Sequence, residues 1–264
     1  MSQPVKVTRR IRLKDFDPEY CGGLDKDETR EETTKLCRQI GEFQDLLYAN
    51  ASHAIIILLQ GMDCSGKDST GRRVLEFVEP SGVEATNFKA PSAEELAHDF
   101  LWRVHKAVPR YGQIGLFNRS HYEDVLIVRV LGLQPKKVWQ ARYEQINAFE
   151  EFLTDNHVIL LKFFLQISKE EQAERLRERL NNPTKRWKFS VVDLEMRKRW
   201  RDFQSAYENA INRCTPKHAP WHIVPANRKW YRDFVVAKTI VEALRNLKTT
   251  WPKPKDDLSN LRIR

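Results

Sequence analysis

The chain has 264 residues, 45 lysines and arginines against 36 aspartates and glutamates, and a formal net charge of +9. Hydrophobic residues make up 41% of it and aromatic residues 10%, which is enough to build a core and excludes a wholly disordered protein. No segment approaches about 18 consecutive apolar residues, so a membrane-spanning helix is also excluded.

Helices and short apolar strands alternate along the chain. Residues 1–28 are expected to form an extended arm, because prolines and the Gly22–Gly23 pair prevent long helices. A helix is predicted over 30–50. Residues 54–59, AIIILL, form an unbroken apolar run that is typical of a strand buried on both faces. A helix from residue 67 to about residue 78 should follow.

The remaining elements repeat this alternation. Further strands are predicted at 82–88, 114–117, 158–167 and 222–226. Further helices are predicted from Ser92 to 104 with Leu96, Phe100 and Val104 on the buried face, over 139–153 and 169–181, from about 193, and over 203–211 and 234–244. The pattern implies one α/β domain over 29–250, with a parallel sheet of about five strands covered by helices on both faces. Pro252 and Pro254 forbid helix continuation, so 251–264 is expected to be a peripheral tail.

The cellular compartment is predicted from the first residues and the cysteines. Residues 1–16 lack the apolar segment of a secretory signal. The four cysteines, Cys21, Cys37, Cys64 and Cys214, lie far apart without a C-x-x-C pair, which argues against a zinc ribbon and a disulfide scaffold. We therefore expect a protein of the reducing cytoplasm.

A phosphate-binding loop is predicted at residues 61–67, GMDCSGK, which fit G-x-x-x-x-G-K between a buried strand and a helix. Glycines allow backbone N–H groups to surround an anion, and the helix that follows adds the positive end of its dipole. Lys67 would place a full charge on a transferring phosphoryl group. The alternative is an ordinary strand-to-helix turn. The predicted phosphate-binding residues are Gly61, Ser65, Gly66, Lys67, Asp68 and Ser69.

Two acids depart from the usual loop. Serine or threonine commonly follows the lysine and holds magnesium, but Asp68 stands there, and Asp63 lies inside the loop. A carboxylate within an anion-binding loop is costly unless a cation lies between it and the phosphates. Asp63 is therefore the first candidate ligand for Mg²⁺, and a turn or cap residue is the alternative. Nothing in the sequence places a base beside Cys64, which argues against a cysteine nucleophile.

A second candidate segment, residues 118–125 (NRSHYEDV), begins at the carboxyl end of a short strand, where ligands bind in open α/β sheets. Asn118 and Arg119 fall at this position, and Arg119 can hold a phosphate through two parallel hydrogen bonds. Glu123 or Asp124 could bind a metal or orient an acceptor, and helix capping is the alternative for either acid. Lys89 follows the neighbouring strand and could touch an acceptor phosphate, with a solvated lysine as the alternative.

The positive charge is concentrated in residues 175–201, which hold ten lysines and arginines against three acids. This net +7 predicts an anionic partner, and a solvated helix face is the alternative. Arg175 and Arg179 share a helix face. Lys185, Arg186 and Lys188 occupy a loop before the next helix. A basic, mobile loop between two helices is what a kinase lid requires, because it closes over phosphates and excludes water.

These blocks resemble the family-2 polyphosphate kinases, P-loop phosphotransferases related in fold to thymidylate kinase. The resemblance covers roughly residues 10–250. It is carried by GMDCSGKDST, FKAPSAEELAHDFLWRVHKAVPR, IGLFNRSHYEDVLIVRV, VILLKFFLQISKEEQ, RLNNPTKRWKF and APWHIVPANRKWYRDFVV. A commoner form of the first block has glycine where Ser69 stands here. The resemblance implies a P-loop kinase-like fold, in which a parallel five-stranded sheet is flanked by helices and a helical lid spans about 175–192.

The resemblance also implies an activity, which is reversible phosphoryl transfer from inorganic polyphosphate to a nucleotide, AMP to ADP or ADP to ATP. Mg²⁺ is the implied cofactor, with Mn²⁺ as a substitute. The implied catalytic residues are Asp63, Lys67, Arg119, Asp124 and Arg179, with Asp63 and Asp124 on the metal. The predicted nucleotide-binding residues are Lys89, Asn118, Arg119, Glu123, Arg129, Arg175, Lys185, Arg186 and Lys188. A homo-dimer or homo-tetramer is expected, with neither a nucleic acid nor a membrane as partner.

Two other functions stay open from the sequence. An ATP-dependent nucleoside or nucleotide kinase would use the same loop with a different donor. A nucleic-acid-binding protein would use the basic segment without sequence specificity, but it leaves the phosphate loop and residues 118–125 unexplained. The concentration of charge favours a longer anion than one triphosphate. We therefore expect polyphosphate to lie along the basic helices, with Arg199 and Arg201 among its contacts.

Overall fold

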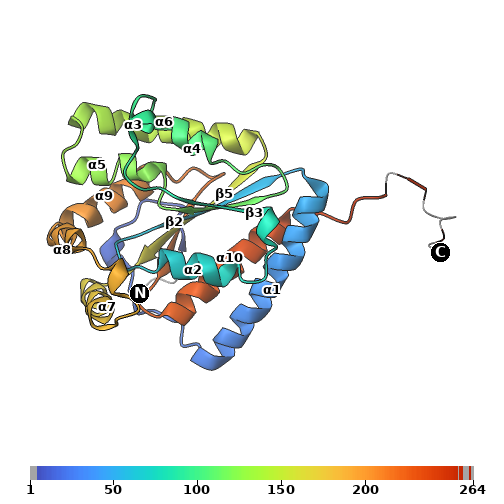
Figure 1. The fold of residues 1–264 in the computed structure, drawn as a ribbon, viewed down its shortest axis with the longest axis horizontal. Helices are drawn as coiled ribbons and strands as arrows, with labels where there is room; N and C mark the ends of the chain where they lie inside the picture. Colours follow the sequence, from blue (N-terminus) through green and yellow to red (C-terminus); the bar gives the residue numbers. More distant parts are fainter. Residues whose placement is uncertain (1–4, 255, 258–261, 263–264) are drawn as a thin grey trace.

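A six-stranded sheet with the order β1-β6-β5-β2-β4-β3 runs through the molecule (Figure 1). The computed structural model describes residues 5–254, 256–257 and 262. Five strands are mutually parallel and lie where short apolar strands were predicted. They are β2 (Ala54–Gln60), β3 (Val83–Asn87), β4 (Ile114–Asn118), β5 (Val158–Gln166) and β6 (Trp221–Pro225). The predicted parallel five-stranded sheet is therefore confirmed.

The prediction of a merely extended N-terminal arm is incomplete, because a sixth strand forms within it. Strand β1 (Val5–Lys6) pairs antiparallel with β6, so that Lys6 lies opposite His222. Beyond it, four apolar side chains of the arm are buried in the core, those of Val7, Ile11, Leu13 and Phe16. Their burial anchors the arm on the edge of the sheet. Residues 1–4 of the predicted arm lie outside the described residues.

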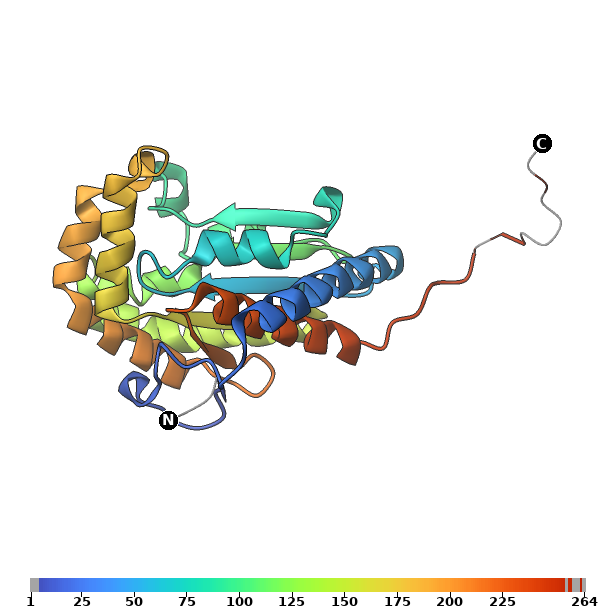
Figure 2. The same cartoon turned by 90° about the horizontal axis from the view of Figure 1, so that it is seen from below.

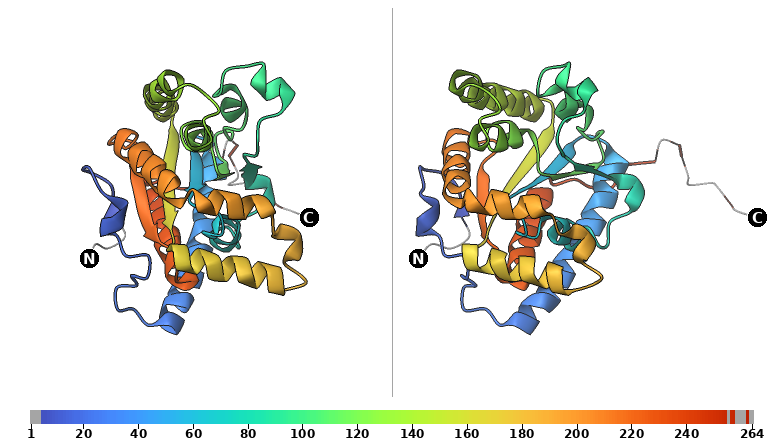
Figure 3. Two further views of the ribbon diagram at one scale, coloured as in Figure 1. Left: turned by 90° about the vertical axis from the view of Figure 1, so that its left-hand side faces the viewer. Right: turned by 60° about the vertical axis from the view of Figure 1, so that its left-hand side comes forward.

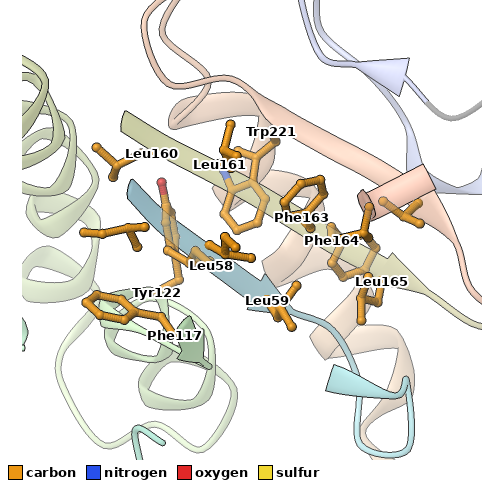
Figure 4. Close-up of a cluster of buried hydrophobic side chains, with 14 of the residues drawn as sticks. Leu58, Leu59, Phe117, Tyr122, Leu160, Leu161, Phe163, Phe164, Leu165 and Trp221 are labelled. Carbon is orange, nitrogen blue, oxygen red and sulfur yellow. The ribbon is translucent and has the colours of Figure 1, made fainter. Parts of the chain in front are cut away.

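Apolar burial on both faces explains the central strands. Every residue of β2 is buried, and only one of the nine residues of β5 is not fully buried. Figure 4 shows Leu58 and Leu59 of β2 beside Phe163 and Phe164 of β5 in this core. An unbroken apolar run can satisfy such a position because a central parallel strand is covered on both sides. These strands hold the loops at their carboxyl ends in a fixed arrangement.

Helices cover the two faces of the sheet and one end of it. On one face lie α1 (Lys26–Asn50), α2 (Lys67–Val74) and α10 (Lys229–Asn246), and on the other lie α4 (Trp102–Lys106), α5 (Ile127–Val130), α6 (Lys136–Asp155) and α9 (Trp200–Arg213) (Figure 1). Helices α7 (Lys169–Asn181) and α8 (Val191–Lys198) lie across the carboxyl ends of the strands (Figures 2 and 3). None of the described helices is long and apolar enough to cross a membrane.

Two predicted helices are shorter than expected. The continuous helix from Ser92 to 104 is wrong, because α3 (Ala93–Leu96) ends before α4 begins. The Asp99 carboxylate accepts the N–H groups of Leu101 and Trp102, which forms a turn immediately before α4. Leu96, expected on the buried face, is 70% exposed, whereas Val104 is fully buried. The helix after the phosphate loop ends at Val74 rather than near residue 78.

At the C-terminus the chain leaves the body after α10 (Figure 1). Residues 251–254 are in no helix or strand, as expected for the predicted tail. The rest of that tail, apart from residues 256–257 and 262, lies outside the described residues.

Candidate active site

The predicted phosphate loop connects β2 to α2 at the carboxyl edge of the sheet. Its two glycines have positive φ angles, 151° at Gly61 and 100° at Gly66. A Cβ atom on Gly61 would lie 2.6 Å from the Leu165 carbonyl oxygen, and one on Gly66 would lie 1.8 Å from Arg232 Nη1. Only glycine fits such positions without strain. The strand–loop–helix context that distinguishes a phosphate loop from a chance match is therefore present.

Lys67 closes the loop on itself. Its Nζ donates hydrogen bonds to the carbonyl oxygens of Gly61, at 2.8 Å, and Met62, at 3.2 Å. Burial, together with the positive charge of Arg119, lowers the pKa of Lys67 to about 8. Phosphate oxygens near this ammonium group would favour its charged form and raise that pKa again. The side chain is thus held ready at the position where an anion would sit.

Arg119 joins the second segment to the phosphate loop. Its Nη2 donates to Asp63 Oδ1 at 2.6 Å, and its Nη1 lies 3.5 Å from Glu123 Oε2. The charges of Glu123 and Asp63 raise the pKa of Arg119 even though burial opposes them. Asn118 at the end of β4 donates to the Asp68 carboxylate. The two segments that were predicted separately therefore meet at the ends of neighbouring strands.

Two buried arginines donate hydrogen bonds to backbone carbonyls of the phosphate loop. Arg175 on α7 donates to the carbonyl oxygens of Cys64, Ser65, Ala226 and Asn227 at 2.7–3.2 Å, and its Nε donates to Glu171 at 2.6 Å. All five N–H groups of a guanidinium are thereby used on the protein. These contacts indicate a supporting role for Arg175, and its expected contact with the nucleotide stays a prediction.

Arg232 on α10 is the second of these arginines, and the sequence reasoning missed it. It is 1% exposed and donates to the Ser65 carbonyl at 3.3 Å and to Ser69 Oγ at 3.1 Å. Asp233 pairs with it at 2.8 Å. In the sequence, Arg232 and Asp233 stand out as charged residues among apolar ones in this helix. From the sequence alone, both side chains could equally have been exposed to solvent.

The lid helices bring one further acid to the loop. Asp193 on α8 lies 3.7 Å from Arg179 on α7. Burial, and then the negative charge of Asp63, raise the pKa of Asp193. Gln172 of α7 donates to the Asp63 carbonyl oxygen at 3.0 Å and accepts from Arg197 of α8. Helix α7 thus contacts the phosphate loop just before the predicted lid, and Asp193 is a functional candidate that sequence reasoning did not select.

Asp124 of the second segment lies between two arginines. Its Oδ1 accepts from Arg142 of α6 at 2.9 Å, and Arg103 of α4 lies 3.9 Å from its Oδ2. Burial raises the pKa of Asp124, although both arginines act against this. Asp124 thus connects the second segment to α4 and α6, and its expected role as a metal ligand stays a prediction.

The other predicted cations lie further out. Lys89 is exposed at the end of β3. Lys185 pairs with Glu178, Arg186 donates to the Leu180 carbonyl at 2.8 Å, and Lys188 lies over the Trp187 ring. Arg129 of α5 donates to Ser205 of α9 at 3.2 Å and lies over the Trp139 ring. Their contacts with a nucleotide stay predictions.

The parallel sheet, the glycine-bounded phosphate loop and the basic helices over it define a P-loop kinase-like protein. The family model described as polyphosphate kinase 2 (PPK2) matches residues 23–251, and the chain belongs to this family. It is 48% identical over 253 residues to an AMP/ADP-polyphosphate phosphotransferase of Meiothermus ruber, covering 95% of each chain. It is 40% identical to an ADP-polyphosphate phosphotransferase of Rhodopseudomonas palustris over 86% of this chain and 84% of that one. The crystal structure of polyphosphate kinase 2 from Arthrobacter aurescens TC1 has a TM-score of 0.94 and 39% identity, over 96% of this chain and 92% of that chain.

Proposed function

We propose that this protein transfers a phosphoryl group from inorganic polyphosphate to AMP or ADP. The observation that carries the proposal is that Lys67, Arg119 and helix α7 all contact the phosphate loop at the carboxyl edge of the sheet. Membership of the family and the names of the two relatives support polyphosphate as donor and an adenine nucleotide as acceptor. Acceptance of both AMP and ADP follows the name of the M. ruber relative.

The site residues supply positioning and positive charge. Phosphoryl transfer passes through a transition state with charge spread over the equatorial oxygens, so fixed cations aimed at that position accelerate it. Lys67 would contact these oxygens from the loop, and Arg119 would do so from the end of β4. Arg179 of the lid would approach from the opposite side. Closure of the lid would exclude water, which otherwise accepts the phosphoryl group.

The residues at the loop fit a magnesium ion. Mg²⁺ is usually held by one or two carboxylates together with substrate phosphates. Asp63 and Asp193 are two such carboxylates. Burial raises the pKa of Asp193, and the negative charge of Asp63 raises it further, as expected for two acids that face the same site. Among the described residues there is no group of three or more metal-ligating side chains. Asp63 and Asp193 would hold the ion, which when bound neutralises phosphate charge.

The direct test supplies AMP, Mg²⁺ and long-chain polyphosphate without ATP. The expected result is formation of ADP and then ATP, and Lys67→Met should abolish it. Formation of ADP only when ATP replaces polyphosphate would refute the proposed donor and favour a nucleotide kinase. Salt-sensitive DNA binding without nucleotide turnover would favour the nucleic-acid alternative.

The metal site has a test of its own. Asp193→Asn should raise the Mg²⁺ or Mn²⁺ concentration needed for half-maximal activity tenfold or more, because one carboxylate ligand is lost. Glu195→Gln is the matched control, since this acid lies on the same helix, is exposed and pairs with Lys198. Equal metal dependence of the two variants would contradict the role of Asp193.

Oligomeric state and compartment belong to the same proposal. We expect a homo-dimer or homo-tetramer in the cytoplasm. Light scattering of the purified chain tests the first, and fractionation of cells that express it tests the second.

A further inference from the structure

A charged cluster lies in the core behind the segment that carries Arg119. Glu150 of α6 and Lys162 of β5 are both fully buried and form an ion pair. Lys162 Nζ also donates to Tyr122 Oη at 3.0 Å and to the Cys214 carbonyl at 2.9 Å. Tyr122 Oη donates to Glu150 Oε1 at 2.8 Å, and His121 Nε2 lies 3.2 Å from the same oxygen.

Burying the charges of such a cluster carries a large desolvation cost. Taking both charges out of water costs more than their attraction recovers, unless further hydrogen bonds satisfy them. Burial alone would raise the pKa of Glu150, but Lys162 and His121 outweigh it and bring the pKa below its usual value. The carboxylate is therefore ionised. Apolar residues of similar volume often give equal or greater stability, so the cluster calls for a reason other than stability.

The cluster is connected to Arg119 through three consecutive residues. Ser120 Oγ accepts the Tyr122 N–H and the Gln60 side chain, both at 3.2 Å, and Gln60 is the last residue of β2 before the phosphate loop. The Arg119 N–H donates to the Leu59 carbonyl at 3.1 Å. The turn after β4 is thus held by hydrogen bonds to β2 on one side and to Glu150 on the other.

Arg119 needs this support because its backbone is strained. Its φ angle is +63°, in the left-handed region that residues with a Cβ atom rarely adopt. Such a conformation persists only where the surrounding structure over-determines it. The turn that begins at His121 also carries Glu123, which contacts the Arg119 guanidinium. A shift of this turn would therefore move both the backbone and the ion-pair partner of Arg119.

We propose that Glu150, with Lys162 as its charge partner, is a positioning residue that fixes the turn after β4 and so holds Arg119 against the phosphate loop. This inference rests on the proposed function, because Arg119 is taken to contact the transferring phosphoryl group. Glu150 itself touches no substrate. Its carboxylate acts by accepting hydrogen bonds from His121 and Tyr122, and Lys162 keeps that carboxylate ionised in the core.

Two double variants separate positioning from the ion pair. Glu150→Leu with Lys162→Met removes both charges and the hydrogen-bond acceptor. Glu150→Gln with Lys162→Met removes both charges but keeps an acceptor for Tyr122 and His121. The leucine variant should have a kcat at least tenfold below that of the glutamine variant, with KM values for nucleotide and polyphosphate within about threefold. Equal kcat values would overturn the proposal.

A second readout is independent of activity. Hydrogen exchange at residues 118–124 should be at least tenfold faster in the leucine variant than in the glutamine variant, while exchange in β2 should be the same in both. If the wild type lacks polyphosphate-dependent turnover, the proposed function fails, yet this comparison still decides the positioning role. Equal exchange at 118–124 overturns it.

Milder variants keep the proposal testable if the leucine variant does not fold. If the leucine variant does not fold, Tyr122→Phe deletes one hydrogen bond to Glu150 and should lower kcat at least threefold. This loss should shrink below twofold when Arg119 is already replaced by lysine, because interacting sites are not additive. Ile240→Ala lowers stability away from the cluster, because Ile240 is a buried residue of α10 on the other face of the sheet. A kcat for Tyr122→Phe equal to that of Ile240→Ala would overturn the proposal.

Discussion

Replacement of Arg175 by methionine distinguishes an arginine that supports the phosphate loop from one that binds a nucleotide. The Arg175 guanidinium donates hydrogen bonds to four backbone carbonyls and to Glu171. Two of these carbonyls belong to the phosphate loop, and the other two follow β6. Methionine fills a similar volume but supplies no donor. The variant should therefore lose stability even when no substrate is present.

The size of the loss follows from the contacts. The Ser65 carbonyl keeps Arg232 as a donor, so three carbonyls, of Cys64, Ala226 and Asn227, lose the bond from Arg175. Each lost hydrogen bond costs roughly 1 kcal/mol net, and bonds from a charged donor cost somewhat more. The free energy of unfolding should fall by about 3 kcal/mol. For a chain of this size that is a drop in Tm of roughly 6–12 °C.

Urea unfolding without ligands measures this loss. Arg177→Met is the matched control, since Arg177 lies two residues along the same helix and is exposed. Its unfolding free energy should stay within about 0.5 kcal/mol of the wild type. If Arg175→Met were as stable as this control without ligand and lost only the stabilisation by bound nucleotide, Arg175 would be a nucleotide contact and the reasoning would be refuted.

Two further predictions concern the phosphate loop, and a third concerns helix α9. Because the pKa of Lys67 is lowered to about 8 in the free protein, kcat/KM should fall as pH rises through about 8. Lys67→Arg should remove this alkaline fall, and a profile flat to pH 10 in the wild type would contradict it. Gly66→Ala should reduce kcat/KM at least a hundredfold, since its Cβ would meet Arg232; near-normal activity would show that the loop tolerates a side chain there. Arg201→Ala should raise KM for long-chain polyphosphate at least threefold more than KM for tripolyphosphate, unlike Lys217→Ala, and equal changes would count against a polyphosphate path along α9.

Much of the fold was predictable because its signals are local. The run AIIILL predicts a strand buried on both faces, and β2 is buried throughout. The helix predicted over 169–181 is present as α7, and it begins after Ser168, whose side chain accepts the Glu171 N–H. One predicted helix failed because a side chain competes with the backbone for hydrogen bonds. The Asp99 carboxylate accepts two backbone N–H groups between α3 and α4. The apolar spacing had predicted one continuous helix from Ser92 to 104.

By itself, the sequence determined the order of the five parallel strands along the chain, the phosphate loop and the second segment at the next strand end. Periodicity, glycine positions and the placement of loops at the carboxyl ends of parallel strands are properties of contiguous residues. Only the tertiary structure showed which charged side chains lie against the phosphate loop. Arg175, Arg232 and Asp193 are charged residues in helices, and nothing in their own neighbourhood tells a solvated charge from a buried one. Their partners lie far along the chain, so their roles depend on how the helices pack around the loop.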